Sequence, residues 1–88
     1  MSYAVRLTGP AAKALESLDQ TTLKRLQARI DELAHDPFSP RISKPLKTAP
    51  GRRSSRIGGW RLIYQVNENE HLVFITAILP RQAAYRKL

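Results

Sequence analysis

The side chains most able to do chemistry in this sequence are arginines and lysines, and they are unevenly distributed. Residues 1–40 hold five basic and five acidic residues, whereas residues 41–88 hold ten basic residues and two acids, Glu68 and Glu70. The segment 41–66 has seven basic residues and no acid. Charge that only keeps a protein in solution is usually mixed in sign, so this basic half favours a surface that binds a polyanion, above all RNA.

The usual catalytic residue sets are missing from the sequence. It has no Cys, no HExxH, no GxGxxG and no phosphate-binding P-loop. Its two histidines, His35 and His71, are far apart in sequence, and we interpret both as structural. No metal site and no cofactor are therefore expected. Arginine matches phosphate oxygens through its bidentate fork, but it is too basic to accept a proton near neutral pH.

One reaction suits such residues, namely the cleavage of RNA by the substrate's own 2′-hydroxyl. The nucleophile is then part of the substrate, and the protein has to align it and stabilise charge on the phosphate. Arginines would supply the charge, and an aromatic residue such as Tyr85 could hold a base by stacking. If the protein is an enzyme, these residues favour a metal-independent endoribonuclease.

The first half of the sequence predicts one strand and two helices. The segment 3–7 alternates in the manner of a strand. Thr8 indicates the start of a helix that ends near Leu18, and Asp19 can cap a second helix that ends before Pro37. The second helix has an apolar stripe formed by Leu23, Leu26, Ile30 and Leu33. The two helices are expected to form a hairpin with one buried face each.

The second half predicts three strands. Arg53–Ile57 and Trp60–Asn67 flank Gly58-Gly59, which is typical of a β-hairpin. His71–Leu79 is apolar on both faces, which suits a strand in the middle of a sheet. The segment 37–51 contains four prolines and a glycine, so we expect an ordered connection without a regular element.

These elements predict a single α+β domain over residues 1–88, in the order β-α-α-β-β-β. The helical hairpin should pack on one face of a small, mainly antiparallel sheet, and residues 81–88 should form a short basic tail. The longest apolar run is far shorter than the roughly 20 residues of a membrane span, and no signal-peptide core follows the N-terminus. We expect a cytoplasmic protein with no membrane contact.

Counting along the third strand assigns its side chains to two faces. Leu62, Tyr64 and Val66 should face the helices, so Arg61 should lie on the face that the helices leave uncovered. Only some of Arg52, Arg53 and Arg56 can point the same way. A concave basic sheet face is predicted, with ordinary solvent-facing strand residues as the alternative interpretation.

Two sequence segments resemble a known family. Gly59-Trp-Arg-Leu-Ile-Tyr-Gln-Val66 and Pro80-Arg-Gln-Ala-Ala-Tyr85, together with Leu46 ahead of the basic hairpin, are similar to the RelE branch of the RelE/ParE superfamily of bacterial toxins. The resemblance covers essentially the whole chain. It implies ribosome-dependent cleavage of mRNA in the A site, which inhibits translation. It also implies a cognate antitoxin that forms a hetero-oligomer with the toxin.

The resemblance also implies roles for single residues. Arg61 would contact the scissile phosphate, Arg81 would stabilise charge or donate a proton, Tyr85 would stack on a base, and Arg52 lies where such toxins often have a catalytic Lys. The residues expected to bind RNA are Arg53, Arg56, Lys47, Lys44 and Arg86. Ser54 replaces a second Lys of the family pattern, and the general base stays without an assignment.

Two other functions remain open from the sequence. A ParE-like toxin would have the same fold, would inhibit DNA gyrase through protein contacts, and would need no nuclease chemistry. A non-catalytic RNA-binding module would explain the charge equally well, but it would not require Arg81 and Tyr85 at this spacing.

Overall fold

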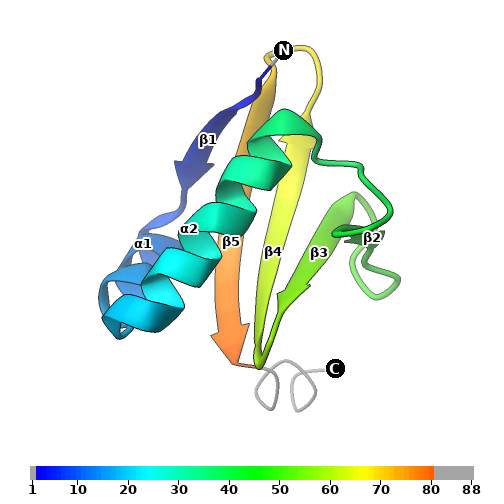
Figure 1. Cartoon of the computed structure of the whole chain (residues 1–88). Coiled ribbons are helices and arrows are strands. Elements are labelled where there is room, and N and C mark those ends of the chain that lie inside the picture. The colour runs from blue at the N-terminus through cyan, green and yellow to red at the C-terminus, as the bar shows by residue number, and fades with distance from the viewer. Residues whose placement is uncertain (1, 81–88) are drawn as a thin grey trace.

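The computed structural model describes residues 2–80 and has two helices packed against one face of a five-stranded mixed sheet (Figure 1). The strand order is β1-β5-β4-β3-β2, in which β1 runs parallel to β5 and the other neighbours are antiparallel. The predicted α+β architecture is confirmed. The elements are β1 (Ala4–Leu7), α1 (Gly9–Glu16), α2 (Gln20–His35), β2 (Lys44–Pro45), β3 (Arg52–Ile57), β4 (Trp60–Asn67) and β5 (Leu72–Pro80).

Both helices begin at the N-caps that the sequence predicts. The Thr8 Oγ1 accepts a hydrogen bond from the Ala11 amide at 3.3 Å, and the Asp19 Oδ2 accepts one from the Thr22 amide at 3.2 Å. Helix α1 ends at Glu16, two residues before Leu18, and Ser17 caps it by donating from its hydroxyl to the Ala14 carbonyl at 2.8 Å. Each cap satisfies backbone groups that a helix end leaves without partners.

The segment 37–51 contains a strand that the sequence analysis did not predict. Lys44 and Pro45 form β2 and pair with Ser54 and Arg53 of β3. A proline is tolerated there because β2 is an edge strand, where its missing N–H removes no hydrogen bond from the sheet interior. Strand β5 begins at Leu72 and not at His71, since His71 has a left-handed φ of 52° and belongs to the turn.

Strand β5 lies between β1 and β4, as its apolar character on both faces predicts. Its register against β4 shifts at one point: Ile63 is opposite Ala77, whereas Tyr64 is opposite Ile75. Thr76 is therefore an extra residue, a β-bulge. The bulge explains why Val73, Ile75 and Ile78, which are not evenly spaced, all belong to the core.

The core lies between the helices and the sheet and includes Leu26 and Leu33 of α2 and Leu62 and Tyr64 of β4. All four side chains are fully buried. The faces predicted for β4 are thus correct, with Leu62 and Tyr64 toward the helices. Within residues 2–80, no helix is long and apolar enough to cross a membrane.

Candidate nucleic-acid interface

The register of the sheet determines which basic residues share a face. Side chains directly opposite each other on neighbouring strands point to the same side. Arg56 is opposite Arg61, and Arg52 is opposite Gln65. Since Leu62 and Tyr64 face the helices, Arg52, Arg56 and Arg61 lie on the uncovered face. Arg53 is opposite the buried Tyr64 and lies on the helical side of the sheet.

A groove of about 180 Å³ lies beside the β3 edge. Basic residues from α2, the segment 40–44, β3 and β4 line it. Strand β2 covers only the first half of β3, so the edge beyond Ser54 is not paired with β2. The groove contains no acid among the described residues that line it. These are Arg29, Pro40, Arg41, Ile42, Ser43, Lys44, Ser54, Arg56 and Arg61.

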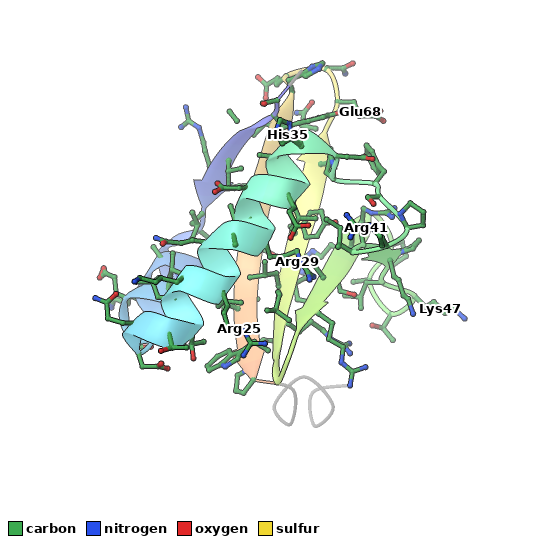
Figure 2. The ribbon with its side chains drawn as sticks, in the orientation of Figure 1. Arg25, Arg29, His35, Arg41, Lys47 and Glu68 are labelled. Carbon is green, nitrogen blue, oxygen red and sulfur yellow. The ribbon has the colours of Figure 1, made fainter. Side chains whose placement is uncertain are left out.

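Arg29 connects helix α2 to this edge. Its Nη1 donates to the Ser55 hydroxyl at 2.9 Å and to the Arg56 carbonyl at 2.8 Å, and its Nε donates to Glu32 at 3.3 Å. The second carboxylate oxygen of Glu32 lies 3.8 Å from the Arg41 guanidinium. Figure 2 shows Arg29 and Arg41 beside β3, with Lys47 further out on the loop after β2. Arg29 therefore brings positive charge to the groove and also holds the helix on the strand.

The segment before β2 is fastened to the sheet by a chain of hydrogen bonds. Arg53 donates from Nε to the Ser43 hydroxyl at 2.7 Å, and Ser43 is hydrogen-bonded to Tyr64. Because a carbonyl only accepts, the single phenol proton of Tyr64 goes to the Pro37 carbonyl, at 2.7 Å, and the Ser43 hydroxyl donates to Tyr64. The Arg53 guanidinium also lies 5.1 Å from the ring centroid of Phe38.

Burial raises the pKa of the Tyr64 phenol, although its hydrogen bond with Ser43 acts in the opposite direction. Tyr64 is therefore a neutral donor at physiological pH, and its contacts have a structural purpose. They place residues 40–44 along the groove. Arg53 contributes to this arrangement from the helical side, so in the structure its side chain binds protein groups.

The electrostatics of the groove favour an anion. Arg56 and Arg61 are directly opposite each other on two paired strands, so their side chains lie on the same face. A phosphate bound beside them can accept hydrogen bonds from both guanidinium groups. The hydroxyl of Ser54 lies in the same groove and adds a neutral donor. The arrangement can therefore bind and polarise a phosphodiester.

The residues predicted from the sequence separate into several groups. Arg61, Arg56 and Lys44 line the groove, and Arg52 lies on the same face but lines a different depression with Glu68. Lys47 is exposed and is not among the residues that line the groove. Arg81, Tyr85 and Arg86 lie outside the described residues.

Two basic residues of the groove, Arg29 and Arg41, were not predicted to belong to the site. Arg29 comes from the half of the sequence with balanced charge, next to Ile30 and three residues after Leu26 of the apolar stripe. That position at the border of a buried helix face was the available signal, because such a side chain can reach the sheet. Arg41 belongs to the basic segment 41–66, but no role was predicted for it.

Comparisons with known proteins identify the family of this chain. The family model described as "ParE toxin of type II toxin-antitoxin system, parDE" matches residues 5–85. The chain belongs to the RelE/ParE superfamily of toxins. The resemblance that the sequence motifs indicated is thereby confirmed.

Curated relatives and solved structures extend over almost the whole chain. Toxin RelE of Mycobacterium tuberculosis is 33% identical in an alignment that covers 96% of this chain and 87% of that protein. Toxin RelG of the same organism is 30% identical in an alignment that covers 99% of this chain and 100% of that protein. The toxin–antitoxin complex RelBE2 of Mycobacterium tuberculosis contains a chain that is 29% identical to this one. The two structures superpose with a TM-score of 0.81, and the superposition covers 92% of this chain and 100% of that chain.

Proposed function

We propose that this RelE/ParE-superfamily toxin is a ribosome-dependent endoribonuclease that cleaves mRNA in the A site and inhibits translation. The acid-free groove with Arg56 and Arg61 in directly opposite positions is the observation that carries the proposal. Relatives named Toxin RelE and Toxin RelG support the assignment. The reaction requires no metal, because the guanidinium groups supply the positive charge that a metal would otherwise bring to the phosphate.

The proposed reaction uses the 2′-hydroxyl of the substrate. Its oxygen attacks the adjacent phosphorus and forms a 2′,3′-cyclic phosphate, while the bond from phosphorus to the 5′-oxygen of the next nucleotide breaks. Arg61 and Arg56 hold the non-bridging oxygens, on which negative charge grows in the transition state. Arg81 would add charge or a proton, Tyr85 would stack on a base, and Arg52 would contact RNA beside the groove.

A cognate antitoxin is the protein partner that we propose. A solved relative is one chain of a toxin–antitoxin complex, which supports a hetero-oligomer for this chain as well. The cytoplasm, where ribosomes translate mRNA, is the proposed location. Co-expression of the protein encoded by the adjacent gene should suppress any growth arrest that this chain causes.

Substitution of the two groove arginines tests the proposed reaction. Arg61→Ala and Arg56→Ala should each slow single-turnover cleavage on programmed ribosomes by about 100- to 1000-fold, the effect of losing one donor to a developing anion. The matched control is Arg6→Ala, which removes an exposed arginine from β1 on the same sheet face. Primer extension with and without ribosomes reports the cleavage, and circular dichroism reports folding.

The same protein sample should be assayed for inhibition of DNA gyrase supercoiling. A gyrase inhibitor without nuclease activity would keep its potency in both alanine variants and would produce no cleavage product on ribosomes. A non-catalytic RNA-binding module would bind ribosomes and leave the mRNA intact. Either result would contradict the proposed endoribonuclease.

A further inference from the structure

Beside the groove lies a second depression that combines an aromatic ring with charged side chains. It has a volume of about 250 Å³, and we call it the Phe38 depression. The residues that line it include Phe38, Pro45, Arg52, Arg53, Val66 and Glu68. Arginine binds phosphate, and an exposed aromatic ring stacks on the face of a nucleobase. An aromatic residue and arginines in one depression are therefore suited to a nucleotide of single-stranded RNA.

The ring of Phe38 is exposed, whereas its backbone is fixed. The residue is 38% exposed, and the Arg53 guanidinium lies 5.1 Å from the ring centroid. The Phe38 amide donates to the Asp36 carboxylate at 3.1 Å. The carbonyl of the preceding Pro37 accepts from the Tyr64 hydroxyl at 2.7 Å. A ring that is already held in place loses little conformational entropy when it stacks on a base, so Phe38 offers a prearranged stacking surface.

Two charged side chains of the Phe38 depression have no partner within residues 2–80. Arg52 and Glu68 are exposed, and neither side chain makes a hydrogen bond or an ion pair with another described residue. Arg52 can therefore hold a phosphate. The Glu68 carboxylate has two oxygens that only accept hydrogen bonds. The Watson–Crick edge of guanine offers two adjacent N–H groups to such a pair, and no other RNA base does, so the depression favours guanine.

The surroundings of Phe74 show that an exposed ring alone does not make such a site. Phe74 of β5 is also 38% exposed, and it lines another depression together with Glu68 and Glu70. No basic residue is among the described residues that line that depression. A phosphate would be repelled there, because the two carboxylates have its sign of charge and no cation offsets them. Phe38 differs from Phe74 by the arginines beside it.

The Phe38 depression adjoins the groove along two strands. In β2, Lys44 lines the groove and the next residue, Pro45, lines the depression. In β3, Arg56 lines the groove and Arg52 lines the depression, and both lie on the uncovered face of the sheet. Their backbones are roughly 13 Å apart along the extended strand. An RNA strand with one phosphate at Arg56 can therefore place a base on the Phe38 ring a short distance along its chain.

We propose that the Phe38 depression binds a guanine of the mRNA near the cleaved phosphodiester. The Phe38 ring stacks on the base, the Glu68 carboxylate accepts hydrogen bonds from its Watson–Crick edge, and Arg52 holds a phosphate beside it. The proposal deepens and rests on the proposed endoribonuclease function, to which it adds a preference for one base. The base that Tyr85 would hold in that reaction is a different one.

Binding of short oligonucleotides without ribosomes tests the site apart from cleavage. The probes are fluorescent oligomers of abasic spacer nucleotides that carry one guanosine, one inosine or no base. Fluorescence anisotropy should show that the wild-type protein binds the guanosine probe about 5- to 100-fold more tightly than the base-free probe, the effect of one stacked base. The phosphates are the same in all probes, so the difference reports the base alone.

Substitution of Phe38 tests stacking. Phe38→Leu keeps an apolar side chain without an aromatic ring, so it should bind every probe as weakly as the wild-type protein binds the base-free probe. Phe38→Trp should retain the preference for the guanosine probe, because its indole also stacks. Phe74→Leu is the matched control, since it removes a ring of equal exposure outside the Phe38 depression. Circular dichroism reports the folding of each variant.

Substitution of Glu68 tests the recognition of guanine. Inosine lacks the N2 amino group, so the wild-type protein should bind the guanosine probe at least about 5-fold more tightly than the inosine probe. Glu68→Gln should remove this difference, because a carboxamide presents one acceptor and one donor in place of two acceptors. Glu70→Gln is the matched control, since Glu70 is an exposed residue of the same turn that does not line the Phe38 depression.

Ribosome assays decide whether the base belongs to the mRNA. The mRNAs differ only in the bases beside the cleavage site, which is first mapped with the wild-type protein. The wild-type protein should cleave fastest with guanine at one of these positions, and Phe38→Leu should lose that preference. If Phe38→Leu slows the cleavage of all these mRNAs by the same factor, the mRNA is not the ligand of the depression and the assignment is overturned.

The remaining outcomes separate the base site from the proposed function. Equal binding of the guanosine and base-free probes by the wild-type protein would overturn the base site while the proposed function stands. The same holds if Phe38→Leu binds the probes as the wild-type protein does and weakens only the binding of the proposed antitoxin, because the depression is then a protein contact. If the wild-type protein cleaves no mRNA on ribosomes, the proposed function and the mRNA assignment fail, whereas the anisotropy measurements still decide base binding.

Discussion

At the scale of single residues, the basic side chains of this protein divide into those that bind protein groups and those that face the groove. Arg53 donates to Ser43 and lies over Phe38, so it holds the segment before β2 in place. Arg29 does both, since it lines the groove and donates to the Arg56 carbonyl. A loss of activity on substitution of either residue therefore needs a measurement of folding before it is assigned to RNA binding.

Tyr64 should contribute measurably to stability through its hydroxyl. Tyr64→Phe leaves the buried Pro37 carbonyl and the Ser43 hydroxyl without one partner, so the free energy of unfolding at pH 7 should fall by about 1–3 kcal/mol. Urea unfolding followed by circular dichroism measures the change. Tyr3→Phe is the matched control, because the Tyr3 ring stacks on His71 at the rim of the sheet. An unchanged stability in Tyr64→Phe would show that water replaces the lost hydrogen bonds.

The same residue predicts a pH dependence. The folded state raises the pKa of Tyr64 above its ordinary value of 10.0, so the folded protein holds the phenol proton more tightly than the unfolded chain. The resulting stabilisation is fully present below pH 10.0 and is lost as the pH rises through the raised value. Urea unfolding between about pH 8 and pH 11 should show a decline in the wild-type protein that is smaller in Tyr64→Phe. Parallel curves for the two proteins would contradict this assignment.

At the scale of elements, the β3–β4 hairpin is the unit that creates the arginine pair. Its two-residue turn, Gly58-Gly59, determines the register and so places Arg56 opposite Arg61. Gly58 has a left-handed φ of 55°, the conformation that a glycine at the first position of a type II′ turn supplies. The Arg25 Nη2 lies 3.2 Å from the position that a Cβ at residue 58 would occupy.

Substitution in this turn should distinguish the two glycines. Gly58→Ala introduces a Cβ at positive φ and close to Arg25, and it should lower the free energy of unfolding by about 1–2 kcal/mol. Gly59→Ala meets no atom within 4 Å and has no positive φ, so it should change stability by less than about 0.5 kcal/mol. Urea unfolding of both variants measures the difference. Equal effects would mean that the turn does not impose the conformation seen at Gly58.

At the scale of the whole molecule, the positive charge is concentrated in the part of the chain that forms most of the sheet. The chain has a formal net charge of +8, and its positive excess belongs to the half of the sequence that forms most of the sheet. Five cationic side chains surround the groove at the β3 edge, and the helices cover one face of the sheet (Figure 1). A surface of this kind attracts a polyanion over a distance and releases its counterions on contact.

Binding of RNA should therefore weaken steeply with salt. If each of the five cations neutralises one phosphate, the logarithm of the association constant for a single-stranded oligoribonucleotide should fall with a slope of up to about −3.5 against the logarithm of salt concentration. Arg41→Gln should make the slope shallower by about 0.7, whereas Lys13→Ala should leave it unchanged. Fluorescence anisotropy between about 50 and 200 mM KCl measures the slope. An affinity independent of salt would contradict the electrostatic basis of binding.

Local patterns in the sequence determined the elements and much of the site. Thr8 and Asp19 predicted the helix starts because capping depends on neighbouring residues alone. The two-residue periodicity of β4 predicted that Arg61 and Leu62 face opposite sides, since alternation is a property of any extended strand. The residue motifs around Arg61 also identified the superfamily.

Only the tertiary structure decided which distant segments meet. The pairing of Lys44 with Ser54 depends on how the proline-rich segment returns to the sheet. Arg29 reaches the groove because α2 packs close enough to β3 for the Arg29 side chain to bond the Arg56 carbonyl. The bulge at Thr76 was equally hidden, since a strand that is apolar on both faces carries no signal for a change of phase. Such contacts depend on packing between residues far apart in the chain, which periodicity and local propensity do not encode.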